Sequence, residues 1–177
     1  MKKISILIVG IFLCLSSFGQ VVPLNDVINF TPFKKMEKID RGQLKQMDRT
    51  KVKFPTINIE HSSGEFYKLS STCLLQLNGM MSETTDNYLN KLKKGFDASH
   101  SWSSDPGYTS VIKTYNNYQV LIINRAYTEQ FISHYSFFCV SNTKVCCLNG
   151  KLEYNSADKE QAAVMLDELL KSIRFKK

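Results

Sequence analysis

The C-terminal segment 151–177, KLEYNSADKEQAAVMLDELLKSIRFKK, carries the strongest secondary-structure signal in the chain. Its apolar residues recur at helical spacing and form one stripe, made up of Ala162, Met165, Leu166, Leu169, Leu170 and Ile173. Asn155 or Ser156 can cap the start of such a helix, while Lys171 and Arg174 suit its negative end. A helix with one apolar stripe must bury it against another element. We therefore expect a terminal helix that covers a sheet.

The segments before this helix are expected to supply the sheet. Residues 133–140, SHYSFFCV, and 144–148, KVCCL, are rich in aromatic and β-branched residues, and the turn-forming SNT between them predicts a hairpin. Residues 109–127 predict two more strands joined at Asn116 and Asn117, which tolerate the left-handed turn conformation. Further strands are expected upstream, at 56–61 and 71–79. The predicted fold class is α+β, with an antiparallel sheet flanked by helices.

A second helix is predicted at residues 83–94, with one apolar face formed by Tyr88, Leu89, Leu92 and Phe96. Ser82 offers an N-cap, and Gly95 followed by an apolar residue resembles a glycine-ended helix. Residues 20–55 are less periodic, and we expect one short helix in them, near 43–49.

The N-terminal residues 1–19 match the charged, apolar and small-residue regions of a secretory signal peptide. The apolar run is too short to span a bilayer, and the small residues that follow it predict cleavage after Gly19. Lipidation of Cys14 and a buried N-terminal helix are the alternatives; bulky Leu13 disfavours the first, and the missing amphipathic pattern disfavours the second. Residues 20–177 are therefore expected to form a single exported domain, periplasmic or secreted, without stable membrane insertion.

Export leaves four cysteines in a compartment that permits disulfides: Cys73, Cys139, Cys146 and Cys147. A two-residue hairpin loop at 142–143 would place Cys139 opposite Cys146, close enough for a bridge, and a four-residue loop would give the same register. Cys147 would point to the other face of the strand, where it either packs in the core or pairs with Cys73. Because the adjacent cysteines point in opposite directions and the histidines lack zinc spacing, we expect no metal site.

Known catalytic motifs do not occur in the sequence. The chain has no G-x-S-x-G elbow, no glycine-rich phosphate loop and no H-E-x-x-H, and nothing marks a cysteine as activated. The net charge of +7 is spread over short basic groups that solvated helix faces explain. We therefore expect no cofactor and no nucleic-acid partner.

The order of the predicted elements, with NGKLEY at 149–154 and LLKSIRF at 169–175, resembles the Mog1/PsbP-like α/β/α sandwiches. The resemblance extends over residues 56–175 and rests on a few packing residues: Gly150, Leu169, Leu170, Ser172, Ile173 and Phe175. It implies a sheet between helical layers, closed by the terminal helix. Members of this group are mostly binding or accessory proteins without a shared catalytic apparatus, so the resemblance implies an interaction module and transfers no active site.

The segment HSWSSDPGY, residues 100–108, predicts a surface loop. Trp102, with Asp105 and Tyr108 nearby, is a candidate for binding a partner, because aromatic side chains bury much area in interfaces. The alternative is that Trp102 fills a gap beneath the loop.

Two functional hypotheses follow. In the first, the chain is a non-catalytic exported protein that binds another protein, most concretely a periplasmic immunity or inhibitor protein that neutralises a secreted toxin. Small size, export, missing catalytic motifs and the aromatic loop favour it. In the second, the chain is a small envelope hydrolase or redox enzyme, which a deep pocket with converging titratable groups would favour. The sequence does not indicate an oligomeric state.

Overall fold

The computed structural model describes residues 21–24, 26, 28–33, 36–46, 57, 63–100, 107–127 and 132–176. The expected signal peptide, most of the strand expected at 56–61, and the loop residues Trp102 and Asp105 lie outside this part of the chain. No helix within it has the length and apolar character needed to cross a membrane.

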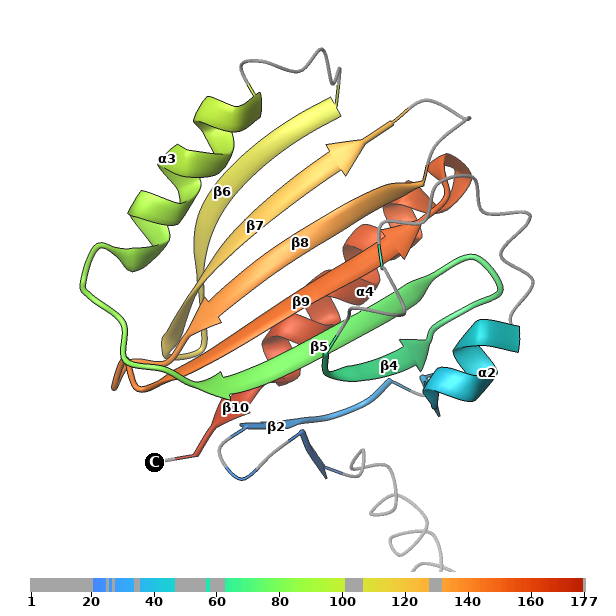
Figure 1. The fold of residues 1–177 in the computed structure, drawn as a ribbon, viewed down its shortest axis with the longest axis horizontal. Coiled ribbons are helices and arrows are strands. Elements are labelled where there is room, and N and C mark those ends of the chain that lie inside the picture. Colours follow the sequence, from blue (N-terminus) through green and yellow to red (C-terminus); the bar gives the residue numbers. More distant parts are fainter. Residues whose placement is uncertain are drawn as a thin grey trace, which may run out of the picture.

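The described strands form two antiparallel sheets (Figure 1). The smaller has the order β1 (Val22–Pro23), β2 (Ile28–Phe30), β10 (Arg174–Phe175). The larger has the order β3 (Glu37–Ile39), β4 (Glu65–Lys68), β5 (Leu74–Met81), β9 (Cys146–Tyr154), β8 (Ser133–Val140), β7 (Tyr118–Ala126), β6 (Gly107–Tyr115). The helical segments are α2 (Arg41–Gln46), α3 (Tyr88–His100), the 3-10 turn η3 (Ser156–Asp158) and α4 (Lys159–Ser172).

Helix α4 covers one face of the larger sheet, called here the α4 face, and crosses behind the strands in Figure 1. The predicted apolar stripe is confirmed, because Ala162, Leu166 and Leu170 are buried in the main core. Alternate positions of the central strands supply the other side of this core: Leu75, Leu77, Val120, Ile122, Tyr135, Phe137, Cys139, Leu148 and Leu152.

The end of α4 is tied to the β6–β7 hairpin, whose turn at Asn116 has the left-handed conformation expected from the sequence (φ 50°). The Tyr118 hydroxyl donates a hydrogen bond to the Leu170 carbonyl, and the Asn116 amide donates one to the Lys171 carbonyl at 3.0 Å. These bonds satisfy carbonyls that a helix end otherwise leaves without partners.

The sequence that follows α4 closes the fold. The Ser172 hydroxyl donates to the Leu169 carbonyl at 2.8 Å, and Ile173 is fully buried. Phe175 then packs edge-on against Tyr118 with ring centroids 5.3 Å apart, while β10 pairs with β2. The LLKSIRF sequence is therefore a packing element in this chain.

Helices α3 and α2 lie on the opposite face of the larger sheet, called here the α3 face. Leu89 of α3 packs against Leu121 and Ile123. At the other end of the sheet, α2 belongs to a small apolar cluster formed by Ile39, Leu44, Ile57, Phe66 and Leu74. Helices on both faces of an antiparallel sheet make an α/β/α sandwich, so the predicted α+β class is confirmed.

Helix α2 confirms a short helix in this region; it begins at residue 41, and residues 47–49 of the expected range 43–49 lie outside the described part of the chain. Asp40 and Gln43 form reciprocal bonds: the Gln43 N–H donates to the Asp40 carboxylate at 2.7 Å, and the Asp40 N–H donates to the Gln43 side chain at 2.8 Å. This is a capping box, a local signal that places the start of the helix.

The prediction for α3 was wrong at both ends, because the helix begins at residue 88 rather than 83 and continues past Gly95 to residue 100. The preceding segment instead follows the β8–β9 loop. The Ser82 N–H donates to the Val145 carbonyl at 3.0 Å, and the Thr84 N–H donates to the Lys144 carbonyl at 2.8 Å. These backbone hydrogen bonds hold the segment in an extended conformation, so the helix begins only at residue 88.

The predicted cap of the terminal helix was also wrong. Asn155 precedes η3 and makes no side-chain capping bond. The carboxylate of Asp158, at the start of α4, accepts a hydrogen bond from the Thr72 hydroxyl at 2.5 Å and does not cap the helix. The start of α4 is therefore tied to the loop before β5.

The hairpin of β8 and β9 is confirmed, but its predicted register was wrong. Cys139 lies opposite Leu148, and Val140 lies opposite Cys147. Five residues, 141–145, separate the two strands; the Lys144 N–H donates to the Ser141 carbonyl, and Lys144 has a positive φ of 60°. The turn is therefore centred one residue later than predicted. The cysteines of the predicted Cys139–Cys146 bridge are therefore not paired across the strands.

No disulfide joins Cys73, Cys139, Cys146 and Cys147, which are all buried free thiols. Cys139 and Cys146 form no bridge because the register of the hairpin differs from the predicted one by two residues. Cys73 and Cys147 form none because their side chains lie on opposite faces of the sheet.

We predict that Gly150→Ala destabilises the fold by about 1–3 kcal/mol, because an added Cβ would lie 2.0 Å from the ring of Phe137, its partner across β8 and β9. Gly95→Ala is the matched control, since its Cβ would meet nothing within 4 Å inside an exposed helix. It should stabilise the protein by about 0.5–1 kcal/mol. Urea unfolding of both variants measures the difference, and equal effects would contradict the packing argument.

Candidate binding face of the sheet

The α3 face leaves its central strands uncovered between α3 and α2 among the described residues (Figure 1). The side chains presented there are mostly polar and surround a hollow of about 180 Å³. They form what is called here the central strip: Gln76, Asn78, Ser136, Phe138, Asn149 and Lys151. All six are partly exposed.

Strand register explains why these side chains come together. Lys151 of β9 lies between Gln76 of β5 and Ser136 of β8. Asn149, two residues earlier and on the same face, lies between Asn78 and Phe138. Two adjacent rows across three strands thus present amide, hydroxyl and ammonium groups on one surface.

The edge of the strip near β4 is ordered by Ser63. The Gln76 amide donates to the Ser63 carbonyl at 2.8 Å, and the Asn78 amide donates to the Ser63 hydroxyl at 3.0 Å. Gly64 follows with φ of +100°, and a Cβ there would lie 2.1 Å from the Leu77 carbonyl oxygen. The close approach that holds Ser63 in place therefore requires glycine.

A row of titratable side chains borders the strip on the same face. In register across β9, β8, β7 and β6 stand Glu153, His134, Arg125 and Tyr108. The Arg125 guanidinium lies over the Tyr108 ring at 6.0 Å from its centroid. Buried Glu153 accepts a hydrogen bond from the backbone N–H of Ile57.

His134 is the buried base in this row, with 8 % of its surface exposed. Burial lowers its pKa to about 4, and the nearby charges of Lys151 and Arg125 add to this effect. Its Nδ1 atom is buried without a hydrogen-bond partner in the described structure. Burial likewise lowers the pKa of Lys151, while Glu153 opposes that shift. His134 is therefore neutral at pH 7.

The pKa of His134 predicts a pH-dependent stability. The unfolded chain, with an ordinary histidine pKa of about 6.5, binds a proton before the folded chain does, so stability falls as pH drops from about 6.5 towards 4. Between pH 7 and pH 5 the loss should be about 2 kcal/mol from this residue. Urea unfolding at both pH values should show a smaller difference for His134→Gln, and an unchanged difference would contradict this assignment.

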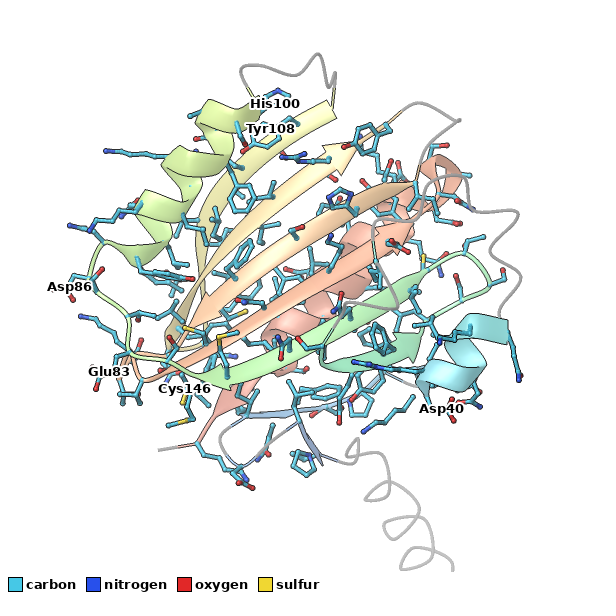
Figure 2. All side chains as sticks on the ribbon, in the orientation of Figure 1. Asp40, Glu83, Asp86, His100, Tyr108 and Cys146 are labelled. Carbon is cyan, nitrogen blue, oxygen red and sulfur yellow. The ribbon has the colours of Figure 1, made fainter. Side chains whose placement is uncertain are left out.

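Tyr108, one of the predicted partner-binding residues, lies at the start of β6 beside the end of α3, where Figure 2 shows it next to His100. The two rings stack with centroids 4.0 Å apart. The Tyr108 hydroxyl donates to Asp97 at 2.8 Å, and Asp97 also pairs with Lys93 at 2.6 Å. The hydrogen bond from Lys93 has the largest effect on the pKa of Asp97, and together with the hydrogen bonds from Ser110 and Tyr108 it lowers this pKa to about 2. These contacts fasten α3 to β6; partner binding by Trp102, Asp105 and Tyr108 remains a prediction.

Three of the described thiols, those of Cys73, Cys139 and Cys147, are poorly suited to nucleophilic catalysis. Burial raises the pKa of Cys139 well above its ordinary value, and it also raises the pKa of Cys73 and Cys147. A raised pKa reduces the thiolate fraction at neutral pH. Among the described residues, no group of three or more His, Cys, Asp and Glu side chains is arranged to hold a metal ion.

We predict that the folded, purified protein carries four reactive thiols once it is unfolded without reductant, in addition to Cys14 if that residue is retained. Alkylation in denaturant followed by intact-mass measurement counts them. Prior reduction should leave the number unchanged. An increase of two or four labels after reduction would show that the sulfur atoms pair.

A second hollow, of about 380 Å³, lies where α3 begins, beside the β6–β7 turn and the β8–β9 loop. Its lining includes four amide side chains: Asn90, Asn117, Gln119 and Asn142. At its rim, the Lys144 ammonium forms an ion pair with Asp86. The lining is mostly exposed, so this is a shallow depression rather than a deep catalytic cleft.

The sequence contained a signal for the central strip. Leu75 and Leu77 of β5, and Leu148 and Leu152 of β9, face α4. The alternate residues Gln76, Asn78, Asn149 and Lys151 are amides or lysine. Two neighbouring central strands with polar alternate positions indicate an uncovered sheet face. Sequence reasoning did not use this signal because the order of the strands was not known.

Comparison with known proteins shows the fold. No protein-family model and no curated protein matches the chain in sequence. Among solved structures, it is similar to the solution structure of cyanobacterial PsbP (CyanoP) from Synechocystis sp. PCC 6803, with a TM-score of 0.50 and 9 % identity. The match covers 89 % of this chain and 92 % of the other. The chain therefore has a Mog1/PsbP-like fold, as the C-terminal sequence indicated.

Proposed function

We propose that this chain is an exported, non-catalytic protein that binds another protein through the central strip. The observation that carries the proposal is the strip itself, a partly exposed surface of hydrogen-bonding groups on three rigid strands. Protein interfaces combine direct hydrogen bonds with aromatic and arginine contacts. The strip offers amides, Phe138 and Lys151, with Arg125 in the adjoining row.

The chemistry of the described side chains supports binding over catalysis. A general base needs a pKa near the working pH and access to its substrate. His134 is buried and its pKa is about 4, while burial raises the pKa of Cys147 on the same face. The hydrogen-bonding groups of the strip can orient a partner. The described residues of the strip include no activated nucleophile.

The specific partner that we propose is a secreted toxin, which the chain would neutralise as an immunity or inhibitor protein. The expected export places both proteins in the same compartment. The basic chain, with a net charge of +7, and the cations at the strip favour an acidic surface on the toxin. A carboxylate-rich segment with hydrogen-bonding side chains would complement both the ammonium and the amides.

We predict that Asn149→Arg weakens partner binding at least about 30-fold, because a long charged side chain at the centre of the strip blocks close contact, at a cost of about 2 kcal/mol. Thr109→Arg is the matched control. It places the same side chain on an exposed position of β6 that faces the other way.

The experiment has three steps. Wild-type protein and both variants are used to capture proteins from an envelope extract, and a protein captured by wild type and Thr109→Arg is identified, purified and titrated by calorimetry. The captured protein is then tested for growth inhibition, with and without the chain. Equal affinity of Asn149→Arg and wild type would refute the strip as the binding surface. A partner that inhibits no growth would refute the toxin proposal while leaving the binding role intact.

A further inference from the structure

Sulfur atoms gather at one end of the larger sheet, around the labelled Cys146 in Figure 2. Here β5 ends and β9 begins, and the register places Met81 opposite Cys146 and Met80 opposite Cys147. Two thiols and two thioethers thus occupy adjacent positions of one strand pair. Met80 and Cys147 adjoin the central strip on the α3 face, whereas Met81 and Cys146 point to the opposite face of the sheet.

Cys146 and Met81 form a direct pair on the α4 face. The Cys146 thiol donates to the Met81 thioether, with 3.4 Å between Sγ and Sδ. Cys146 is only 2 % exposed, whereas Met81 is 64 % exposed. The buried thiol of Cys146 is therefore in direct contact with a thioether that is itself exposed to solvent.

We propose that Cys146 and Met81 bind one monovalent soft metal ion, Cu(I) or its analogue Ag(I). Thiolate and thioether sulfur are the protein ligands that select Cu(I), whereas harder divalent ions prefer carboxylate, carbonyl or imidazole ligands. On binding, the Cys146 S–H bond breaks, the proton leaves to water, and the thiolate and the Met81 lone pair each donate to the ion. The metal does not change its oxidation state.

The pair can open to admit an ion without moving the sheet. With the zinc–thiolate distance of about 2.3 Å as the scale for a metal–sulfur bond, an ion in linear arrangement between two sulfur atoms separates them by about 4.6 Å. The present separation of 3.4 Å must therefore increase by about 1 Å. Met81 has three rotatable side-chain bonds and is largely exposed, so it can move outward while Cys146 stays in place.

The second pair is less suited to the same ion. Met80 and Cys147 face the opposite side of the sheet because successive strand residues alternate. The Cys147 thiol is directed at the Ser82 carbonyl oxygen, 4.0 Å from its sulfur, rather than at a second sulfur atom. Met80 therefore provides a matched control for Met81: it is a neighbouring exposed methionine on the same strand.

The test is an anaerobic Cu(I) titration of the reduced mature protein against a chromophoric Cu(I) chelator. We expect one equivalent of Cu(I) to be withdrawn from the chelator. Met81→Leu, which keeps the side-chain volume and removes the sulfur, should weaken binding at least tenfold, while Met80→Leu should stay within twofold of wild type. Circular dichroism confirms that each variant is folded.

Three results would overturn the proposal: no transfer of Cu(I) from the chelator, equal weakening by Met81→Leu and Met80→Leu, or a wild-type affinity in a folded Cys146→Ser variant. Because Cys146 is buried, its serine variant can fail to fold. Met81→Leu decides the question in that case, since an exposed thioether is lost without opening a cavity.

Discussion

The burial of α4 on the larger sheet is the interaction on which the rest of the structure depends. Its apolar stripe packs against alternate residues of the central strands β5, β7, β8 and β9, and the Tyr118 hydroxyl and Asn116 amide donate hydrogen bonds to the carbonyl groups at its end. Breaking this contact would expose the largest apolar cluster and leave buried polar groups without partners. Ile173 and Phe175 extend the same contact beyond the helix, which explains why the residues after α4 matter as much as the helix itself.

The candidate binding face exists because only one face of the larger sheet packs against α4. Strand side chains alternate, so residues that pack under α4 leave their neighbours on the other face. There, α3 and α2 cover only the apolar ends, over Leu121 and Ile123 on one side and Phe66 and Leu74 on the other. The strands between them carry amides and charges, and no helix within the described residues packs against them. The same strands thus present polar groups on the α3 face without placing any of them in the apolar core under α4.

The parts of the fold that could be predicted were those encoded by local patterns. The stripe of α4, the strands at 109–127 with their Asn116 turn, and the hairpin around SNT all followed from spacing and turn residues. The start of α3 could not be predicted, because backbone bonds from Ser82 and Thr84 to the β8–β9 loop decide it, and these join residues far apart in sequence. The central strip was missed for the same reason, since Asn149 and Asn78 become neighbours only through strand order.

The β8–β9 loop shows how one turn decides the chemistry of a distant pair. With a two-residue loop, Cys146 would lie opposite Cys139 and the two could oxidise to a bridge. The observed loop of residues 141–145, with its Lys144-to-Ser141 hydrogen bond, is centred one residue later and leaves Cys146 beyond the end of β8. Its neighbour across the strands is then Met81 of β5, and a thioether cannot form a disulfide. The position of this turn therefore keeps Cys146 away from Cys139, while the separate pairing of β5 with β9 places the Met81 thioether beside the Cys146 thiol.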